Sequence, residues 1–176
     1  GNLNQKISNS INANSILKVA TINNFTLANS DATRTSLTDN QYVIIGDNNI
    51  HTGTTVVNPV DCPVFADGLV RINKTWMVQE TGTVGKIYIE IDLATYGINS
   101  EILLYMSDND SFTSNSTVVN PIAVTGTKAK FYLDFKNIQY FTVVGKIGPS
   151  ACATCVGDKL IVRQGNSWNT GAKKTN

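Results

Sequence analysis

Few residues in this chain have the types and spacing that enzymatic chemistry requires. His51 is the only histidine, and although Asp47 is near it in sequence, no Gly-x-Ser-x-Gly motif supplies an activated serine. A glycosidase needs two carboxylates that face each other across a cleft, but Glu90 alternates outward on a predicted strand. We therefore expect His51 to be a solvated loop residue, and we expect no catalytic residue and no enzymatic activity.

Two loops carry the oxygen ligands that calcium prefers. They read Ser-Asp-Asn-Asp-Ser at 107–111 and Gly-Asp-Asn-Asn at 46–49, and neither has the full spacing of an EF-hand. Asp108 and Asp110 are the better candidates for a calcium site, and we expect no other cofactor. The alternative is that these side chains cap turns by bonding their own backbone.

The cysteines predict a disulfide rather than a redox or zinc site. Cys152 and Cys155 have a Cys-x-x-Cys spacing, but their flanks do not predict the helix start that an oxidoreductase needs. A structural zinc site needs four ligands, and the chain has only three cysteines and one histidine. In an oxidising compartment the odd count leaves one disulfide and one thiol. The bridge is either Cys152–Cys155 or one from Cys62 to one of them.

Composition excludes several classes of function. Only 15% of the residues are charged, 41% are hydrophobic and the net charge is +1, so nucleic acid and anionic membrane surfaces are not expected partners. No apolar run approaches the roughly 18–20 residues that span a bilayer, and we expect no membrane insertion. No secretion signal opens the sequence, so we expect a mature piece of a larger chain. Abundant Asn, Thr and Ser favour an extracellular β-protein.

Period-two alternation of apolar and polar residues predicts the fold. At 86–92 and 128–135 one face is apolar and the other polar, as in antiparallel sheets with one buried face. Further strands are predicted at 16–22, 41–46, 69–80, 101–107, 117–124, 139–144 and 159–163, with single helical turns at 31–37 and 93–96. We expect an all-β, two-layer antiparallel β-sandwich of about 8–10 strands. The predicted core includes Trp76, Ile87, Ile89, Phe131 and Leu133.

The segment 71–91 could either line a binding site or form central strands, the spine, of a sheet. Trp76 lies among β-branched residues, which favours a side chain buried between the sheets over an exposed ring that stacks on a sugar. Gly82 and Gly85 predict a turn after which 84–91 folds back and pairs with the Trp76 strand. We therefore interpret this segment as a sheet spine.

The predicted domain boundary lies near residue 146. Residues 133–144 are expected to form the last hairpin of a sandwich domain at 1–146. Residues 147–176 then form a linker and one terminal strand, which either completes the sandwich or begins the next domain.

Four stretches together resemble a known family. They are LNQKISNSINANSILKVA (3–20), DNQYVIIGDNN (39–49), RINKTWMVQETGTVGKIYIEID (71–92) and QYFTVVG (139–145). In order, they are similar to the uncharacterised β-rich domain repeated in very large secreted surface proteins of Bacteroidetes, often found beside laminin-G-like lectin domains. The resemblance implies a cell-surface location and a place in an adhesin or surface fibre, without enzymatic activity.

We therefore expect a non-enzymatic structural or adhesion module of a large bacterial cell-surface protein. Its partners would be neighbouring domains of the same chain, and host or environmental glycans or other surface proteins. The alternative is a carbohydrate- or calcium-dependent ligand-binding module. Exposed loop aromatics would support that alternative, and the candidates are Tyr96, Phe112 and Trp168.

The two cysteine pairings predict different responses to reductant. A Cys152–Cys155 bridge closes a loop of about four residues and should stabilise the fold little. A bridge from Cys62 closes about ninety residues and should contribute on the order of 4 kcal/mol, so that reduction lowers the melting temperature by several degrees. Peptide mapping without reductant identifies the pair. If all three thiols label freely in protein recovered from cells, the prediction of a disulfide is wrong.

Overall fold

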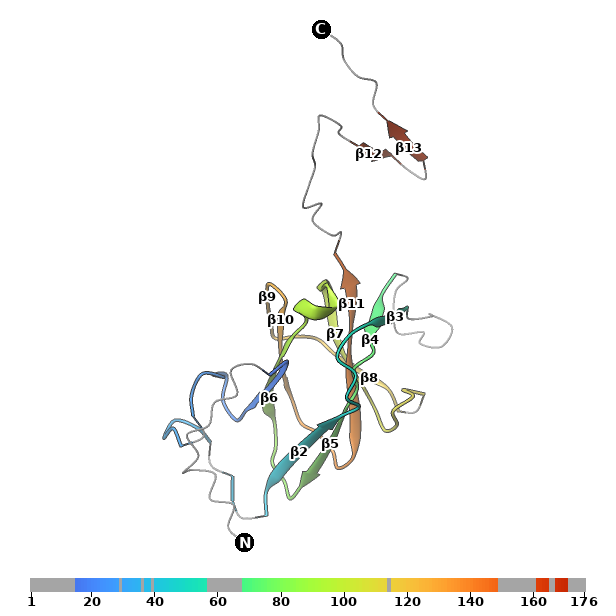
Figure 1. Cartoon of the computed structure of the whole chain (residues 1–176). Coiled ribbons are helices and arrows are strands. Elements are labelled where there is room, and N and C mark those ends of the chain that lie inside the picture. Colours follow the sequence, from blue (N-terminus) through green and yellow to red (C-terminus); the bar gives the residue numbers. More distant parts are fainter. Residues whose placement is uncertain are drawn as a thin grey trace.

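The protein is an all-β fold of two packed antiparallel sheets (Figure 1). The structure is a computed structural model, and it describes residues 15–148 except 29, 36, 39, 57–67 and 114, together with two strands at 161–164 and 167–170. One sheet has four strands, and the other has seven and is strongly curled. The predicted two-layer antiparallel sandwich is confirmed. The strand number is higher because two predicted strands, 69–80 and 117–124, are each divided in two, and because a strand at 54–56 was not predicted.

The four-stranded sheet is a regular antiparallel layer. Its order is β1 (Leu17–Ala20), β6 (Ile87–Asp92), β10 (Lys128–Leu133) and β9 (Ala123–Thr125). The inward side chains of its two central strands are at most 5% exposed, and they are Ile87, Ile89, Ile91, Ala129, Phe131 and Leu133. The alternation read from the sequence at 86–92 and 128–135 therefore describes this layer correctly.

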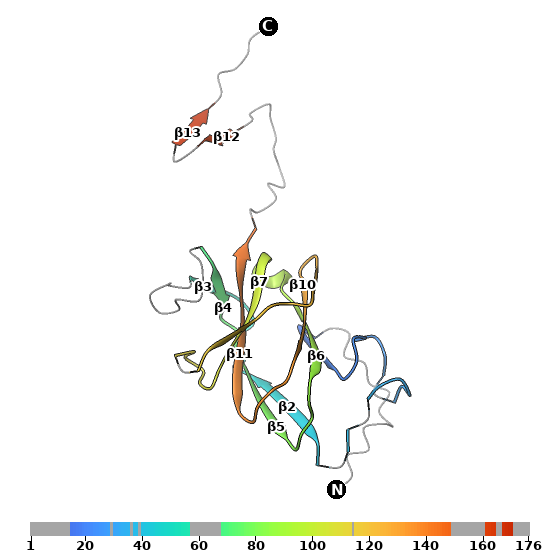
Figure 2. The same ribbon diagram turned by 180° about the vertical axis from the view of Figure 1, so that it is seen from behind.

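The seven-stranded sheet is built around β11 (Gln139–Ile147), which has neighbours on both edges (Figure 2). On one edge it pairs with β7 (Ile98–Ser107), which in turn pairs with β8 (Thr117–Val119). Along the other edge it pairs first with β5 (Trp76–Thr81) and then with β4 (Val70–Ile72). The outer strands are β2 (Tyr42–Asp47) beside β5 and β3 (Thr54–Val56) beside β4.

A bulge divides the strand predicted at 69–80. Five residue steps separate Arg71 from Trp76, whereas only three separate their partners Val144 and Phe141 on β11. Two extra residues therefore leave the ladder, and their polar groups need other partners. The buried hydroxyl of Thr142 supplies one, because Oγ1 lies 2.8 Å from the carbonyl oxygen of Lys74.

Two predicted hairpins are wrong, because both connections cross between the sheets. Residues 84–91 do not pair with the Trp76 strand, since β5 is already paired with β2 and β11 on its two edges, and β6 joins the other sheet instead. Gly82 in this crossing has φ +71°, and a Cβ there would lie 2.6 Å from the carbonyl oxygen of Asn40. Residues 133–144 likewise connect β10 in one sheet to β11 in the other.

One continuous hydrophobic core lies between the sheets. Trp76 is 2% exposed, and its ring stacks on Phe141 with centroids 5.2 Å apart. A short 3-10 helix, η2 (Ala94–Tyr96), places Tyr96 in this core, where a single helical turn was predicted. A second, smaller cluster lies on the side of the larger sheet that faces away from this core. There Phe112 stacks on Tyr105 and packs near Leu69 and Val144.

The C-terminal region holds two strands where one was predicted. β12 (Ile161–Gln164) and β13 (Ser167–Thr170) pair with each other as a separate antiparallel hairpin. The boundary between a domain at 1–146 and a second part at 147–176 stays a prediction.

We expect truncation of Trp76 to be among the costliest single changes in the core. Trp76→Ala should lower the free energy of unfolding by roughly 3–5 kcal/mol, as large core truncations do. Met77 follows it on the opposite face and is 42% exposed, so Met77→Ala should change stability by no more than about 0.5 kcal/mol. Urea unfolding of both variants tests this difference, and equal losses would contradict the central role of Trp76.

Candidate functional site

A lysine lies buried where the larger sheet is interrupted. Lys74 sits in the bulge between β4 and β5 and is only 3% exposed. Because two inserted residues keep the period-two pattern in phase, it alternates with the buried side chains of Ile72 and Trp76. Lysine is almost never fully buried unless its ammonium group is paired.

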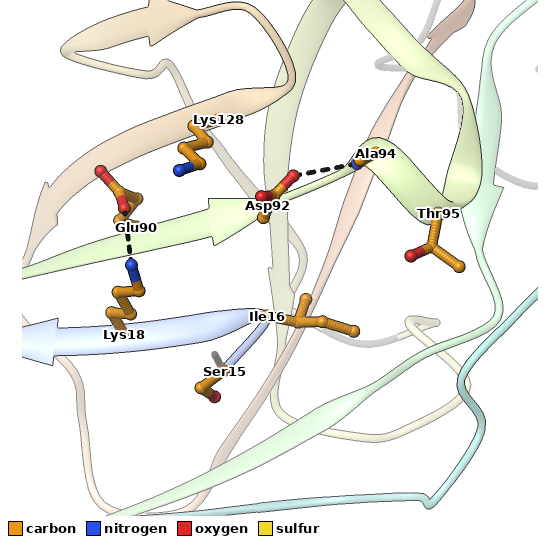
Figure 3. Close-up of a pocket in the computed structure, with 8 residues that line it drawn as sticks. All are labelled: Ser15, Ile16, Lys18, Glu90, Asp92, Ala94, Thr95 and Lys128. Atoms are coloured by element: carbon orange, nitrogen blue, oxygen red, sulfur yellow. Dashed lines mark hydrogen bonds and ion pairs between the residues drawn. The ribbon is translucent and has the colours of Figure 1, made fainter. Parts of the chain in front are cut away.

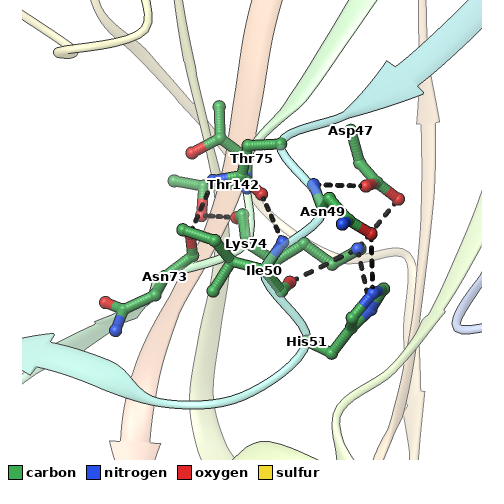
Figure 4. Close-up of polar contacts among 9 residues, drawn as sticks. Asp47, Asn49, Ile50, His51, Asn73, Lys74, Thr75 and Thr142 are labelled. Atoms are coloured by element: carbon green, nitrogen blue, oxygen red, sulfur yellow. Dashed lines mark hydrogen bonds and ion pairs between the residues drawn. The ribbon is translucent and has the colours of Figure 1, made fainter.

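Three acceptors surround this ammonium group (Figure 4). Nζ of Lys74 lies 2.8 Å from Oδ2 of Asp47, 3.3 Å from the carbonyl oxygen of Ile50 and 3.5 Å from Nδ1 of His51. The ring centroid of Trp76 is 5.9 Å from the same atom. An ammonium group has three N–H donors; Asp47 and Ile50 accept from two of them, and Nδ1 of His51 accepts from the third in the tautomer that carries its proton on Nε2.

The loop at 48–53 covers the bulge through its asparagines. Nδ2 of Asn48 donates to the carbonyl oxygen of Asn73 at 2.9 Å, and Oδ1 accepts from the backbone N–H of Thr75 at 3.2 Å. Oδ1 of Asn49 lies 3.0 Å from Nε2 of His51 and so orients the imidazole ring. The loop and the bulge therefore satisfy each other's polar groups.

The electrostatics of this cluster centre on Asp47. The hydrogen bond from Lys74 holds the pKa of the Asp47 carboxyl below its usual range; partial burial opposes this shift, and the backbone N–H of Asn49 adds to it. Burial raises the pKa of the Tyr96 phenol, and the negative charge of Asp47 adds to that shift.

This cluster holds a loop in place, and its contacts differ from those of a Ser–His–Asp triad. The structure brings Asp47 and His51 together around an ammonium group, whereas a Ser–His–Asp arrangement needs a hydroxyl at that position. As a nucleophile, Lys74 would need a free lone pair, but it acts here as a threefold donor. We name the group of Asp47, His51 and Lys74 the lysine lock.

A second group of polar side chains lies on the outer face of the four-stranded sheet. Three directly opposed pairs join β6 to β10: Asp92 with Lys128, Glu90 with Lys130, and Tyr88 with Tyr132. Glu90 also pairs with Lys18 of β1 at 3.6 Å. We call this surface, formed by the outward side chains of β1, β6 and β10 and of the residues that flank β6 and β10, the outer face.

A pocket of about 330 Å³ lies at one end of the outer face (Figure 3). Glu90 and Asp92 line it from β6, and Lys18 of β1 and Lys128 of β10 flank them. Ser15 and Thr95 add hydroxyl groups. Asp92 caps the turn that follows β6, since Oδ1 accepts from the backbone N–H of Ala94 at 3.1 Å. The lining is therefore polar and carries charges of both signs.

Two tyrosines lie at the other end of the outer face. The rings of Tyr88 and Tyr132 stack with centroids 4.3 Å apart, and Tyr132 is 41% exposed. Nζ of Lys86 lies 5.6 Å from the Tyr132 ring centroid. This end offers aromatic surface and phenol groups to solvent.

The predicted calcium loop is held by its own polar side chains. A carboxylate oxygen of Asp108 accepts from the side-chain amide of Asn115 at 2.7 Å, and Oδ1 of Asn109 accepts from the backbone N–H of Thr113 at 3.0 Å. In the described part of the chain, no group of three or more His, Cys, Asp or Glu side chains is placed to hold a metal ion. Calcium binding by Asp108 and Asp110 stays a prediction.

The aromatic residues suggested for a ligand-binding alternative are not exposed where they are described. Tyr96 is 5% exposed and Phe112 is 3% exposed, because each packs into a core cluster. Trp168 lies on β13, and its side chain is outside the described part. The residues named for the core, Trp76, Ile87, Ile89, Phe131 and Leu133, are all buried. Cys62, Cys152 and Cys155 lie outside the described residues.

Comparison with known proteins identifies the family. A family model described as a domain of unknown function (DUF8202) matches residues 1–139 of the 176 residues. The chain belongs to this family. The match ends at the first residue of β11, although the seven-stranded sheet of this DUF8202 chain depends on that strand up to Ile147. No curated protein and no solved structure matches the chain.

The helical content of the fold is small. No helix within the described residues has the length and apolar character that crossing a membrane requires.

Sequence reasoning missed Lys74, Tyr88 and Tyr132 as site residues. Both tyrosines were placed correctly on polar faces, and their outward alternation was the available signal. That they stack depends on the register between β6 and β10. Lys74 alternates with Ile72 and Trp76, which was the available signal, but its burial depends on Asp47, twenty-seven positions earlier.

The lysine lock of this DUF8202 chain predicts a pH-dependent stability. Because the pKa of Asp47 is lowered in the fold, its contribution is complete above the unfolded value of about 3.9 and is lost as the pH falls through the lower folded value. Asp47→Asn should therefore lower the free energy of unfolding by about 1 kcal/mol at neutral pH, because solvent screens the partly exposed carboxylate, and by less at a pH of about 2–3.

Urea unfolding at both pH values measures this difference. Asp134→Asn, at an exposed aspartate, provides the matched control and should show little effect at either pH. A loss for Asp47→Asn that is as large in acid as at neutral pH would contradict the role of the Asp47 carboxylate.

Proposed function

We propose that this DUF8202 chain is a non-enzymatic structural and adhesion module of a large bacterial cell-surface protein. The observation that carries the proposal is how the charged side chains are used. Each of the four ion pairs among the described residues joins two segments that are distant in sequence, as Lys146 of β11 does with Glu101 of β7 at 2.5 Å. These charges hold strands and loops together instead of converging on a reaction centre.

The pairing of β11 also supports a role in transmitting tension along the chain. The chain leaves the described sandwich through β11, which is hydrogen-bonded to β7 on one edge and to β5 and β4 on the other. A force applied at Ile147 would act on a strand that is held along both edges. Such a strand is suited to a module that transmits tension between neighbouring domains.

Composition and resemblance support the location. The chain has a low charged fraction and resembles domains of secreted surface proteins of Bacteroidetes, which are adhesins or surface fibres. We propose an extracellular site at the cell surface, where neighbouring domains, glycans or other surface proteins are the partners.

A ligand-binding module is the second candidate function. The observation that favours it is the outer face, where a partly exposed tyrosine pair and a polar pocket lie on one surface. This surface offers ring faces, hydroxyl groups and charges, which are the groups that recognise sugars.

Protease treatment of intact cells tests the location. Cells that produce the protein should release its peptides into the medium while a cytosolic marker protein stays inside. The peptides should include segments between β1 and β11, detected by mass spectrometry. If these peptides are released only after lysis, together with the marker, the proposed location is wrong.

A further inference from the structure

The outer face carries more positive charge than the fold uses. Its lysines are Lys18, Lys86, Lys128 and Lys130, whereas its carboxylates are Glu90, Asp92 and Asp134, which is exposed two residues after Tyr132. Glu90 is shared by Lys18 at 3.6 Å and Lys130 at 3.8 Å. The other two lysines of this face are Lys86 and Lys128.

Lys86 and Lys128 are exposed, and neither forms an ion pair within the described residues. Asp92 lies directly opposite Lys128, but it is engaged by the backbone N–H of Ala94 and by the hydroxyl of Thr127. Six residue steps separate Lys86 from Asp92 along β6, which corresponds to roughly 20 Å. These two ammonium groups, of which that of Lys86 lies over the Tyr132 ring, thus lie toward opposite ends of one extended surface.

The groups between these lysines suit a sugar chain. Tyr132 offers aromatic surface at one end, and the pocket beside Lys128 offers hydroxyl groups and carboxylate oxygens at the other. Sheet stability accounts for the cross-strand tyrosine and ion pairs, but it does not require free lysines at both ends or a polar pocket. Carboxylates in this position accept hydrogen bonds from hydroxyl groups and repel a dense polyanion.

We propose that the outer face binds a polysaccharide that carries carboxylate groups, such as one built from uronic acids. Lys86 and Lys128 pair with carboxylates of the polymer about 20 Å apart. Tyr132 packs against a sugar ring, and Glu90 and Asp92 accept hydrogen bonds from sugar hydroxyls in and beside the pocket. This inference rests on the proposed adhesion function and assigns its ligand class and its surface.

Native affinity electrophoresis of the full chain tests the ligand class. The gels contain polygalacturonate, its fully methyl-esterified form, dextran sulfate or no polymer. Polygalacturonate should retard the protein, and the retardation should weaken as salt is added, because exposed charges are screened. The esterified polymer has the same backbone without the charge, so it should retard the protein much less.

Substitutions test the surface. Lys86→Gln and Lys128→Gln should each weaken binding to polygalacturonate by roughly two- to fivefold, the range of an exposed ion pair, and the double variant should lose more. Tyr132→Ala should weaken binding without a change in net charge. Lys146→Gln on β11 removes the same charge from the other sheet and should bind as the unmodified chain does. Melting curves of each variant verify the fold.

Three outcomes would overturn the proposal. They are no retardation by polygalacturonate, equal or stronger retardation by dextran sulfate, and an equal loss in Lys146→Gln. The second would indicate attraction by charge alone. None of them changes the result of protease treatment of intact cells, so the proposed surface location is judged separately.

Discussion

The cross-strand pair of Trp76 and Phe141 is the contact on which the sandwich depends. These rings stack at the first position where β5 rejoins β11 after the bulge, and they fix the register of the two strands. Phe135, in the crossing between the sheets, packs on Phe141 with centroids 5.3 Å apart. One aromatic cluster therefore joins β5 and β11 to the connection between the two layers.

Much of the fold could be predicted from alternation, because a strand with one buried face repeats every two residues. Alternation assigns each side chain to a face, but it does not identify the neighbouring strand. For this reason the strands around Trp76 and Ile89 were predicted correctly, whereas their pairing with each other was wrong. Divided strands were missed for a related reason. A two-residue bulge keeps the alternation in phase, so the break in the ladder between Ile72 and Trp76 does not shift the pattern, and only the polar Lys74 marks its place.

The candidate sites were less predictable, because they depend on contacts between distant residues. Asp47 and His51 were identified as neighbours in a loop, but the group that they surround comes from another strand. A lysine in an alternating strand normally indicates a solvated face, and only the covering loop makes Lys74 an interior residue. Tyr88 and Tyr132 likewise look like ordinary outward residues until strand register places them in contact.

The crossings between the sheets have a consequence for how the chain folds. The chain passes repeatedly from one layer to the other, since β5, β7 and β8 belong to one sheet while β6, β9 and β10 belong to the other. Neither layer is made from a contiguous stretch: the four-stranded sheet is complete only when β10 has been made, and the larger sheet only when β11 has been made. The strand that organises the larger layer, β11, is also the last of the sandwich to leave the ribosome. Until it arrives, β5 and β7 have unpaired edges, and the chain must avoid aggregation with those edges open.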